Sequence, residues 1–267
     1  MIHLRSLTVR RSEKENRGFP FNVPIIQSLQ ELQFTAPVTF FVGENGSGKS
    51  TLLEALACAI GSTTVGSESV KTDASLAELR KLAGQLKLVW SKRTQKGFFL
   101  RAEDFFGYAK NLTKIRQEFE EDIRAVDETY EGRSKLAADL AKLPYKNELH
   151  ALKRYGENGL DSHSHGESFL TLFQSRFVPG GLYLLDEPEA PLSPIRQLAF
   201  LSALKRMVTE DSQFIIVTHS PILMAFQPAV ILSFDQGRVQ QVEYDDLEHV
   251  KLTRAFLNDP AAYLNHL

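Results

Sequence analysis

The sequence has a single cysteine, Cys58, and no long hydrophobic run. Cys58 lies in an apolar stretch, so we interpret it as a small core residue rather than a nucleophile or a metal ligand. No apolar run reaches the roughly 18 residues that a membrane helix requires. Residues 1–11 lack the uncharged core of a signal peptide. We therefore expect a cytoplasmic protein that inserts no segment into a membrane.

Paired cysteines and a His-Glu metal motif are also missing, so the few histidines do not indicate a zinc site. The formal net charge is −2, which argues against a polybasic nucleic-acid binder. One segment is different: residues 80–116 hold ten Lys or Arg and two acids, a local balance of +8. This segment is either a solvated surface or a docking face for nucleic acid or an acidic partner.

Residues 43–50 match the phosphate-binding pattern G-x-x-x-x-G-K-[ST]. An apolar run at 38–42 predicts a strand before this loop, and a Leu/Ala-rich run at 49–60 predicts a helix after it. Loop N–H groups and the helix N-terminus favour phosphate. Lys49 would reach the β- and γ-phosphates, and the Ser50 hydroxyl would hold Mg²⁺. The residues expected to contact ATP here are Gly43, Glu44, Asn45, Gly46, Ser47, Gly48, Lys49, Ser50 and Thr51.

A second strand, at 182–185, runs into the carboxylates Asp186 and Glu187. Strand ends meet at the sheet edge where the phosphate loop also lies. Asp186 would hold Mg²⁺, directly or through water, and Glu187 would orient and deprotonate the attacking water. An Asp-Glu pair after an apolar run is common, so the prediction depends on the phosphate loop.

Two further motifs have both a structural and a functional interpretation. Ser164-His165-Gly166-Glu167 precedes a predicted helix and is either a capping box or an anion site. His219 ends a predicted strand at 214–217 and either is structural or contacts the γ-phosphate.

Taken in order, these motifs resemble the ABC-type ATPase fold. They are most similar to the soluble branch with SMC and RecF-like heads, and within it to compact bacterial AAA-family ATPases. The resemblance implies an α/β P-loop fold with a mixed central sheet flanked by helices, an N-terminal antiparallel β lobe and a small helical insert. Further motifs that look like that group are Phe98-Phe99-Leu100-Arg101-Ala102-Glu103, Asp186-Glu187-Pro188-Glu189 and Thr218-His219-Ser220-Pro221.

The resemblance also implies an ATP-dependent homodimer. Ser164 and Gly166, with Glu167, would contact the γ-phosphate held by a second copy, and residues 190–193 would lie between the copies. The strand-end Gln that touches Mg²⁺ in transporter subunits has no clear counterpart. Glu103 is the first candidate for it, before Gln85 and Gln95. Phe19 or Phe21 could stack on adenine, although a structural role is favoured.

We expect an ATPase core at 1–104 and 160–267, with a helical insert at 105–159 broken near Gly132 and Pro144. Other predicted strands are 2–10, a pair at 86–90 and 98–100 around a turn, and a hairpin at 230–234 and 238–243. Residues 11–33 are predicted to be loop with a short turn. A helix is expected at 195–208, and a helical tail from 246 with a break at Pro260.

These features predict an Mg²⁺-dependent ATPase that dimerises around ATP and acts with nucleic acid or in defence. Its partner would be nucleic acid or the product of a neighbouring gene. Two alternatives stay open: the nucleotide-binding subunit of an ABC membrane transporter, and an ATP-gated regulatory switch.

Overall fold

The computed structural model describes residues 1–10, 18–65, 69–101, 117–130, 135–152, 170, 173 and 175–265. Its strands are β1 Leu4–Val9, β2 Glu31–Gln33, β3 Val38–Val42, β4 Leu86–Trp90, β5 Phe99–Arg101, β6 Leu182–Asp186, β7 Gln213–Val217, β8 Val230–Ser233 and β9 Gln240–Val242. Its helices are α1 Pro24–Ser28, α2 Lys49–Ile60, α3 Ala77–Ala83, α5 Lys135–Leu152, α7 Pro194–Thr209, α8 Pro221–Met224, α9 Glu248–Asn258 and α10 Pro260–Leu264. Residues 117–129 are also helical.

A six-stranded sheet in the order β5-β6-β7-β3-β8-β9 forms the centre of the molecule. All neighbours are parallel except β8 and β9, which form the predicted antiparallel hairpin. The strands β3, β6 and β7 therefore end at one edge, with Asp186 in register with Val217. This mixed sheet confirms the predicted fold class.

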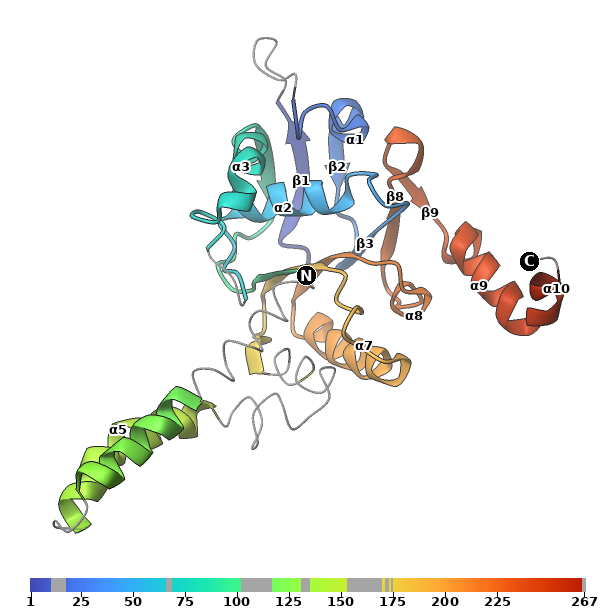
Figure 1. The fold of residues 1–267 in the computed structure, drawn as a ribbon. Coiled ribbons are helices and arrows are strands. Elements are labelled where there is room, and N and C mark those ends of the chain that lie inside the picture. The colour runs from blue at the N-terminus through green and yellow to red at the C-terminus, as the bar shows by residue number, and fades with distance from the viewer. Residues whose placement is uncertain are drawn as a thin grey trace.

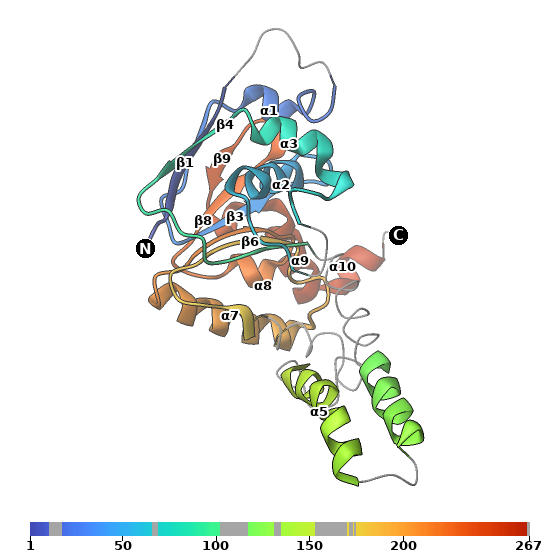
Figure 2. The same ribbon diagram turned by 90° about the vertical axis from the view of Figure 1, so that its left-hand side faces the viewer.

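Each face of the six-stranded sheet is covered by a separate hydrophobic core. Successive residues of β3 point to opposite faces, as the strand period requires: Phe40 joins the core under α7 and α8, and Phe41 joins the core around α2. Figures 1 and 2 show α2 between this sheet and the strands of the N-terminal lobe, with α7 on the far face. The phosphate loop thus starts from a strand that is buried on both sides.

The N-terminal lobe is a three-stranded antiparallel sheet in the order β2-β1-β4, as the resemblance implied. The predicted pairing of 86–90 with 98–100 is wrong, because β4 pairs with β1 and β5 joins the other sheet beside β6. The prediction of loop over 11–33 is wrong at α1 and β2; residues 11–17 lie outside the described part. The three residues of β2 are ordered by pairing with β1, which a local pattern does not reveal.

Two helices from the predicted insert, at 117–129 and α5, extend away from both sheets (Figures 1 and 2). The predicted break at Pro144 is wrong, because α5 runs through it without interruption. An interior proline costs about 3 kcal/mol. On either side of it, α5 contacts the helix at 117–129: Lys142 forms an ion pair with Asp127, and the rings of Tyr145 and Phe119 lie 6.4 Å apart. The predicted break near Gly132 lies outside the described residues.

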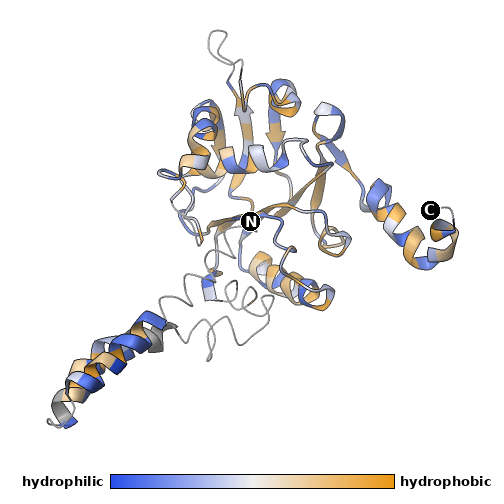
Figure 3. Ribbon diagram, viewed as in Figure 1, coloured by the Kyte–Doolittle hydropathy of each residue, from blue (hydrophilic) through white to orange (hydrophobic). Residues whose placement is uncertain are grey.

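The C-terminal segment forms α9 and α10, with Pro260 starting the second helix as predicted. Only the start of α9 joins a core, through Leu247 and Val250. Hydrophobic and hydrophilic residues alternate along the outer helices α5, α7 and α9 (Figure 3). None of the described helices combines the length and the hydrophobicity that a membrane-spanning helix requires.

Candidate functional site

The phosphate loop joins the end of β3 to the start of α2 and is closely packed by two other segments. Gly43 and Gly48 have φ angles of 137° and 94°, which favour glycine. A Cβ atom on Gly48 would lie 2.6 Å from Cγ2 of Ile25 in α1. A Cβ atom on Gly43 would lie 2.8 Å from Oδ1 of Asp235, which follows β8. Both glycines are therefore required by backbone conformation and by space.

Lys49 is the first residue of α2, and its side chain folds back over the loop. Its Nζ donates to the carbonyl oxygens of Gly43 and Glu44, each at 2.7 Å. Burial lowers the pKa of Lys49, and nearby Glu187 and other carboxylates act in the opposite direction. A partly desolvated cation thus lies beside the loop N–H groups, as binding of a phosphate chain requires.

The Ser50 hydroxyl, in the first turn of α2, donates to Oδ1 of Asp186 at 3.1 Å. Burial raises the pKa of Asp186 to about 7, while the hydrogen bond from Ser50 opposes the rise. A hydroxyl and a carboxylate are the oxygen donors that Mg²⁺ prefers, with water and substrate phosphate completing the shell. These two residues therefore fit Mg²⁺. The described residues contain no group of three or more His, Cys, Asp and Glu that could hold a metal, zinc included.

Glu187 and His219 follow the ends of β6 and β7 and face the same pocket. The pocket measures about 550 Å³ and is lined by Glu44, Asn45, Glu187 and His219. The ring Nε2 of His219 lies 3.7 Å from Oε1 of Glu187. Glu187 has a φ of 47°, and its N–H donates to the Val217 carbonyl at 2.9 Å. Left-handed backbone at a non-glycine residue is a strained feature that concentrates at functional sites.

Glu189 supports the turn at His219 through a contact that the sequence pattern does not indicate. Its Oε1 accepts from the backbone N–H of His219 at 2.7 Å. Burial raises the pKa of Glu189. The motif Asp-Glu-Pro-Glu contains Glu189, but the pattern alone does not reveal its partner 30 residues further along the chain.

Asp235 is a second site residue that its local sequence does not indicate, because it lies in the turn of the predicted hairpin at 230–243. Its Oδ1 accepts from the N–H of Glu44 at 3.0 Å, and its Oδ2 accepts from the hydroxyl of Ser233 at 2.7 Å. The turn after β8 therefore fixes the start of the phosphate loop.

Several predicted site residues lie elsewhere or outside the described part. Ser164, Gly166, Glu167 and Glu103 lie outside the described residues, so their roles stay predictions. Gln85 lies between α3 and β4, and Gln95 lies between β4 and β5; neither lines the pocket. Thr51 continues α2.

The two candidate adenine-stacking residues differ in burial. Phe21 packs against the hydrophobic core around α2, which supports a structural role. Phe19 is exposed over 50% of its surface.

The phosphate loop, the Ser50–Asp186 pair and the strand-end residues around one pocket define a P-loop nucleoside triphosphatase fold. A family described as "AAA domain" matches residues 21–174, more than half of the chain. The chain therefore belongs to the AAA-domain family, which confirms the predicted assignment to P-loop ATPases of AAA type. A second family, described as "AAA domain, putative AbiEii toxin, Type IV TA system", matches residues 168–225.

Solved structures with a similar arrangement include two SMC head domains. One, from Pyrococcus furiosus and bound to the C-terminal domain of ScpA, is 12% identical with a TM-score of 0.46; the match covers 96% of this chain and 100% of that one. The head domain from Thermotoga maritima is 16% identical with a TM-score of 0.41, covering 91% and 100%.

A component of a transporter matches this chain with the same TM-score as the Pyrococcus furiosus head domain. MJ1267, an ATP-binding cassette of an ABC transporter, is 14% identical with a TM-score of 0.46, covering 100% of this chain and 99% of that one. No curated protein matches the chain.

Proposed function

We propose that this protein is an Mg²⁺-dependent ATPase that closes as a dimer around ATP and reopens after hydrolysis. The single observation that carries the proposal is the 3.1 Å hydrogen bond from the Ser50 hydroxyl to Asp186, which joins the phosphate loop to the end of β6. The pocket beside this pair supports it, because Glu187 and His219 line that pocket with residues of the phosphate loop.

In the proposed reaction, Lys49 stabilises the negative charge on the γ-phosphate. Ser50 and Asp186 would hold Mg²⁺, which when bound neutralises charge on the phosphates. Glu187 accepts a proton from water while the water oxygen bonds to the γ-phosphorus. The bond from that phosphorus to the bridging oxygen breaks, and ADP and phosphate leave. His219 would hydrogen-bond the γ-phosphate and respond to its loss.

The second half of each site would come from another copy. By the resemblance stated above, Ser164, Gly166 and Glu167 of one copy would contact the γ-phosphate bound to Lys49 of the other. Residues 190–193 follow β6 and lead into α7, whose first turns expose Ile195 and Leu198 over 72% and 54% of their surfaces. Exposed hydrophobic side chains beside a predicted inter-subunit loop support an interface there.

The variant Glu187→Gln tests this function. It keeps the shape of the side chain and removes the proton acceptor, so we expect kcat to fall roughly 10²–10⁴-fold. The same variant should accumulate as an ATP-bound dimer in size-exclusion chromatography. The control is Glu210→Gln, an exposed carboxylate at the end of α7. Unchanged turnover in Glu187→Gln would remove Glu187 from the role, and a wild-type protein that binds but does not hydrolyse ATP would favour the regulatory switch.

The exposed basic residues favour nucleic acid as the partner that this ATPase acts with. Three of the seven described basic residues at 80–101 are engaged internally, since Arg80 bonds to the carbonyls of Val70 and Asp73, Lys96 bonds to the carbonyl of Pro179 and Arg101 is buried. Lys81 pairs with Glu78. The three others are exposed along and after β4: Lys87, Lys92 and Arg93.

We expect double-stranded DNA to raise ATPase turnover severalfold at about 50 mM salt, with the effect falling steeply by about 200 mM, because bound phosphates release counterions. A variant with Ala at Lys87, Lys92 and Arg93 should lose the stimulation and keep the basal rate. Lys205→Ala, on α7, is the control. Stimulation that persists in the triple variant would contradict the proposal that DNA binds at these three residues. No stimulation at any salt concentration would count against nucleic acid, and co-purification with a membrane protein would then favour the transporter subunit.

A further inference from the structure

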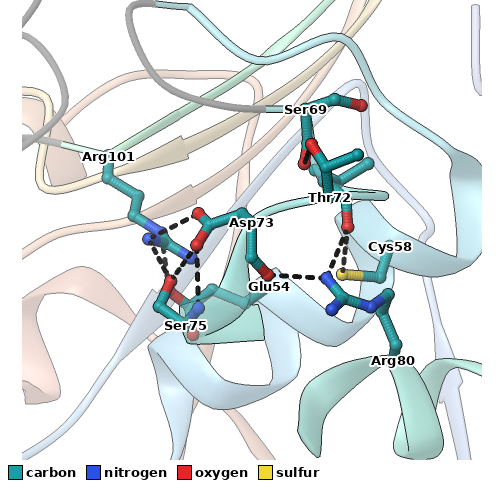
Figure 4. Close-up of polar contacts among 9 residues, drawn as sticks. Glu54, Cys58, Ser69, Thr72, Asp73, Ser75, Arg80 and Arg101 are labelled. Carbon is teal, nitrogen blue, oxygen red and sulfur yellow. Dashed lines mark hydrogen bonds and ion pairs between the residues drawn. The ribbon is translucent and has the colours of Figure 1, made fainter. Parts of the chain in front are cut away.

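Arg101 is a buried cation at the end of β5, held by residues from two other segments (Figure 4). Its Nε lies 2.7 Å from Oε1 of Glu54 on α2. Its Nη1 lies 3.7 Å from Oδ2 of Asp73 and 3.5 Å from the hydroxyl of Ser75, in the segment before α3. The side chain of Arg101 is only 9% exposed, and that of Glu54 is 18% exposed. None of these residues belongs to the phosphate loop or to the Asp-Glu motif.

This cluster is adjacent to the Ser50–Asp186 pair along α2 and across β5 and β6. Glu54 is one turn beyond Ser50 on α2, and residues four apart share one face of a helix. Arg101 is in register with Asp186 across β5 and β6. A second carboxylate, that of Glu54, therefore lies one helical turn from Ser50 of the pair that fits Mg²⁺.

We propose that Arg101 is a positioning residue: it binds the Glu54 carboxylate and keeps it from acting as a metal ligand beside Ser50 and Asp186. The inference rests on the function proposed above. Arginine suits this role because its guanidinium is always charged and presents several donors in a fixed plane. A short contact to Glu54 and longer contacts to Asp73 and Ser75 leave Glu54 turned toward β5.

The consequence is that the site needs the phosphates of ATP to complete the metal shell. With only a hydroxyl and one carboxylate, the empty protein attracts a divalent cation weakly. If Glu54 were released, two carboxylates and a hydroxyl would surround the same position. The cation would then bind without nucleotide. Its position relative to the γ-phosphate would be determined by the protein carboxylates and no longer by ATP.

The test uses Mn²⁺ alone, followed by electron paramagnetic resonance of the free ion. In Arg101→Met, which removes the cation that holds Glu54, we expect Mn²⁺ to bind the nucleotide-free protein roughly tenfold more tightly than in wild type. Glu54→Gln and the double variant Arg101→Met/Glu54→Gln should bind Mn²⁺ as wild type does, because the extra carboxylate is gone. Wild-type affinity in Arg101→Met, or tight binding that persists in the double variant, would overturn the proposal.

Arg101→Met leaves buried carboxylates without this cation, so its folding is checked by circular dichroism. If it does not fold, Arg101→Gln replaces it, because glutamine removes the positive charge but still donates hydrogen bonds to the buried oxygen atoms. The Gln variant should bind Mn²⁺ more tightly than wild type, and equal affinity would overturn the proposal.

Wild type with Mn²⁺ and ATP separates the two levels of inference. If wild type does not bind Mn²⁺ even with ATP, the proposed function fails. If wild type binds Mn²⁺ with ATP, and the nucleotide-free Arg101 variants bind Mn²⁺ with the same affinity as nucleotide-free wild type, only the inference about Arg101 fails.

Discussion

At the scale of single residues, Asp186 combines a functional position with a cost in stability. Its carboxyl is buried beside Glu54 and Glu187, and its pKa rises from 3.8 to about 7, chiefly through burial. A folded-state pKa above the unfolded value means that the folded protein binds the proton more tightly. The contribution of Asp186 to the free energy of unfolding therefore falls as pH rises from about 4 to about 7.

This sign gives a prediction for Asp186→Asn. At pH 4, where the window begins, the folded carboxyl is protonated and resembles the amide, so the free energy of unfolding should change little. At pH 8 the variant should be more stable than wild type by roughly 3–4 kcal/mol, since the rise from 3.8 to about 7 spans about three pKa units of about 1.4 kcal/mol each. Urea unfolding of the nucleotide-free protein with EDTA measures both values, with Glu210→Gln as the exposed control. If the variant and wild type differ in free energy of unfolding by the same amount at both pH values, the prediction is contradicted.

The residues that the sequence could not reveal are those whose partners lie far along the chain. Asp235 contacts Glu44 across 191 positions, and Glu189 contacts the His219 backbone across 30. Each is an acidic residue in or near a turn, where carboxylates are common for local reasons. Lys49, Ser50, Asp186 and Glu187 were found because fixed spacing or a strand end marks them without knowledge of the fold.

At the scale of elements, local sequence specifies some segments fully and others hardly at all. The helix at 49–60 has the predicted bounds, because a glycine turn precedes it and Gly61 ends it in the left-handed region. The strand β6 is a continuous apolar run, as expected for a parallel strand buried on both faces.

The pairing of strands could not be predicted in the same way. β4 and β5 are close in sequence and look like a hairpin, yet β4 pairs with β1 and β5 with β6. Gly97 explains part of this. Its φ is 112°, and a Cβ atom there would lie 1.9 Å from the Leu182 carbonyl oxygen. The glycine lets the chain after β4 pass against the start of β6, instead of turning back on β4.

At the scale of the whole molecule, both hydrophobic cores can be traced without the helical insert. The core under α7 runs from β3 to Phe173, Phe177 and the start of α9, and the core around α2 runs from the lobe to β7. The buried members of both lie outside the described insert helices at 117–129 and α5. Leu140 and Leu143 of α5 are instead exposed over 61% and 52% of their surfaces. The predicted division into core and insert is thus compatible with the packing, and it can be tested directly.

Replacing residues 105–159 by a flexible Gly/Ser linker of about 15 residues should leave the melting temperature of the core nearly unchanged. ATP binding at the phosphate loop should persist, because the variant keeps Lys49, Ser50 and Asp186. The comparison is a truncation at residue 246, which removes Leu247 and Val250 from the core under α7. Burial of two such side chains contributes roughly 3–6 kcal/mol, so this truncation should lower the melting temperature by roughly 10 °C. Differential scanning calorimetry and a fluorescent ATP analogue measure the two properties. If excision of 105–159 lowers the melting temperature as much as the truncation does, the insert is part of the core fold, and the hydrophobic contacts that hold the two sheets together must extend into it.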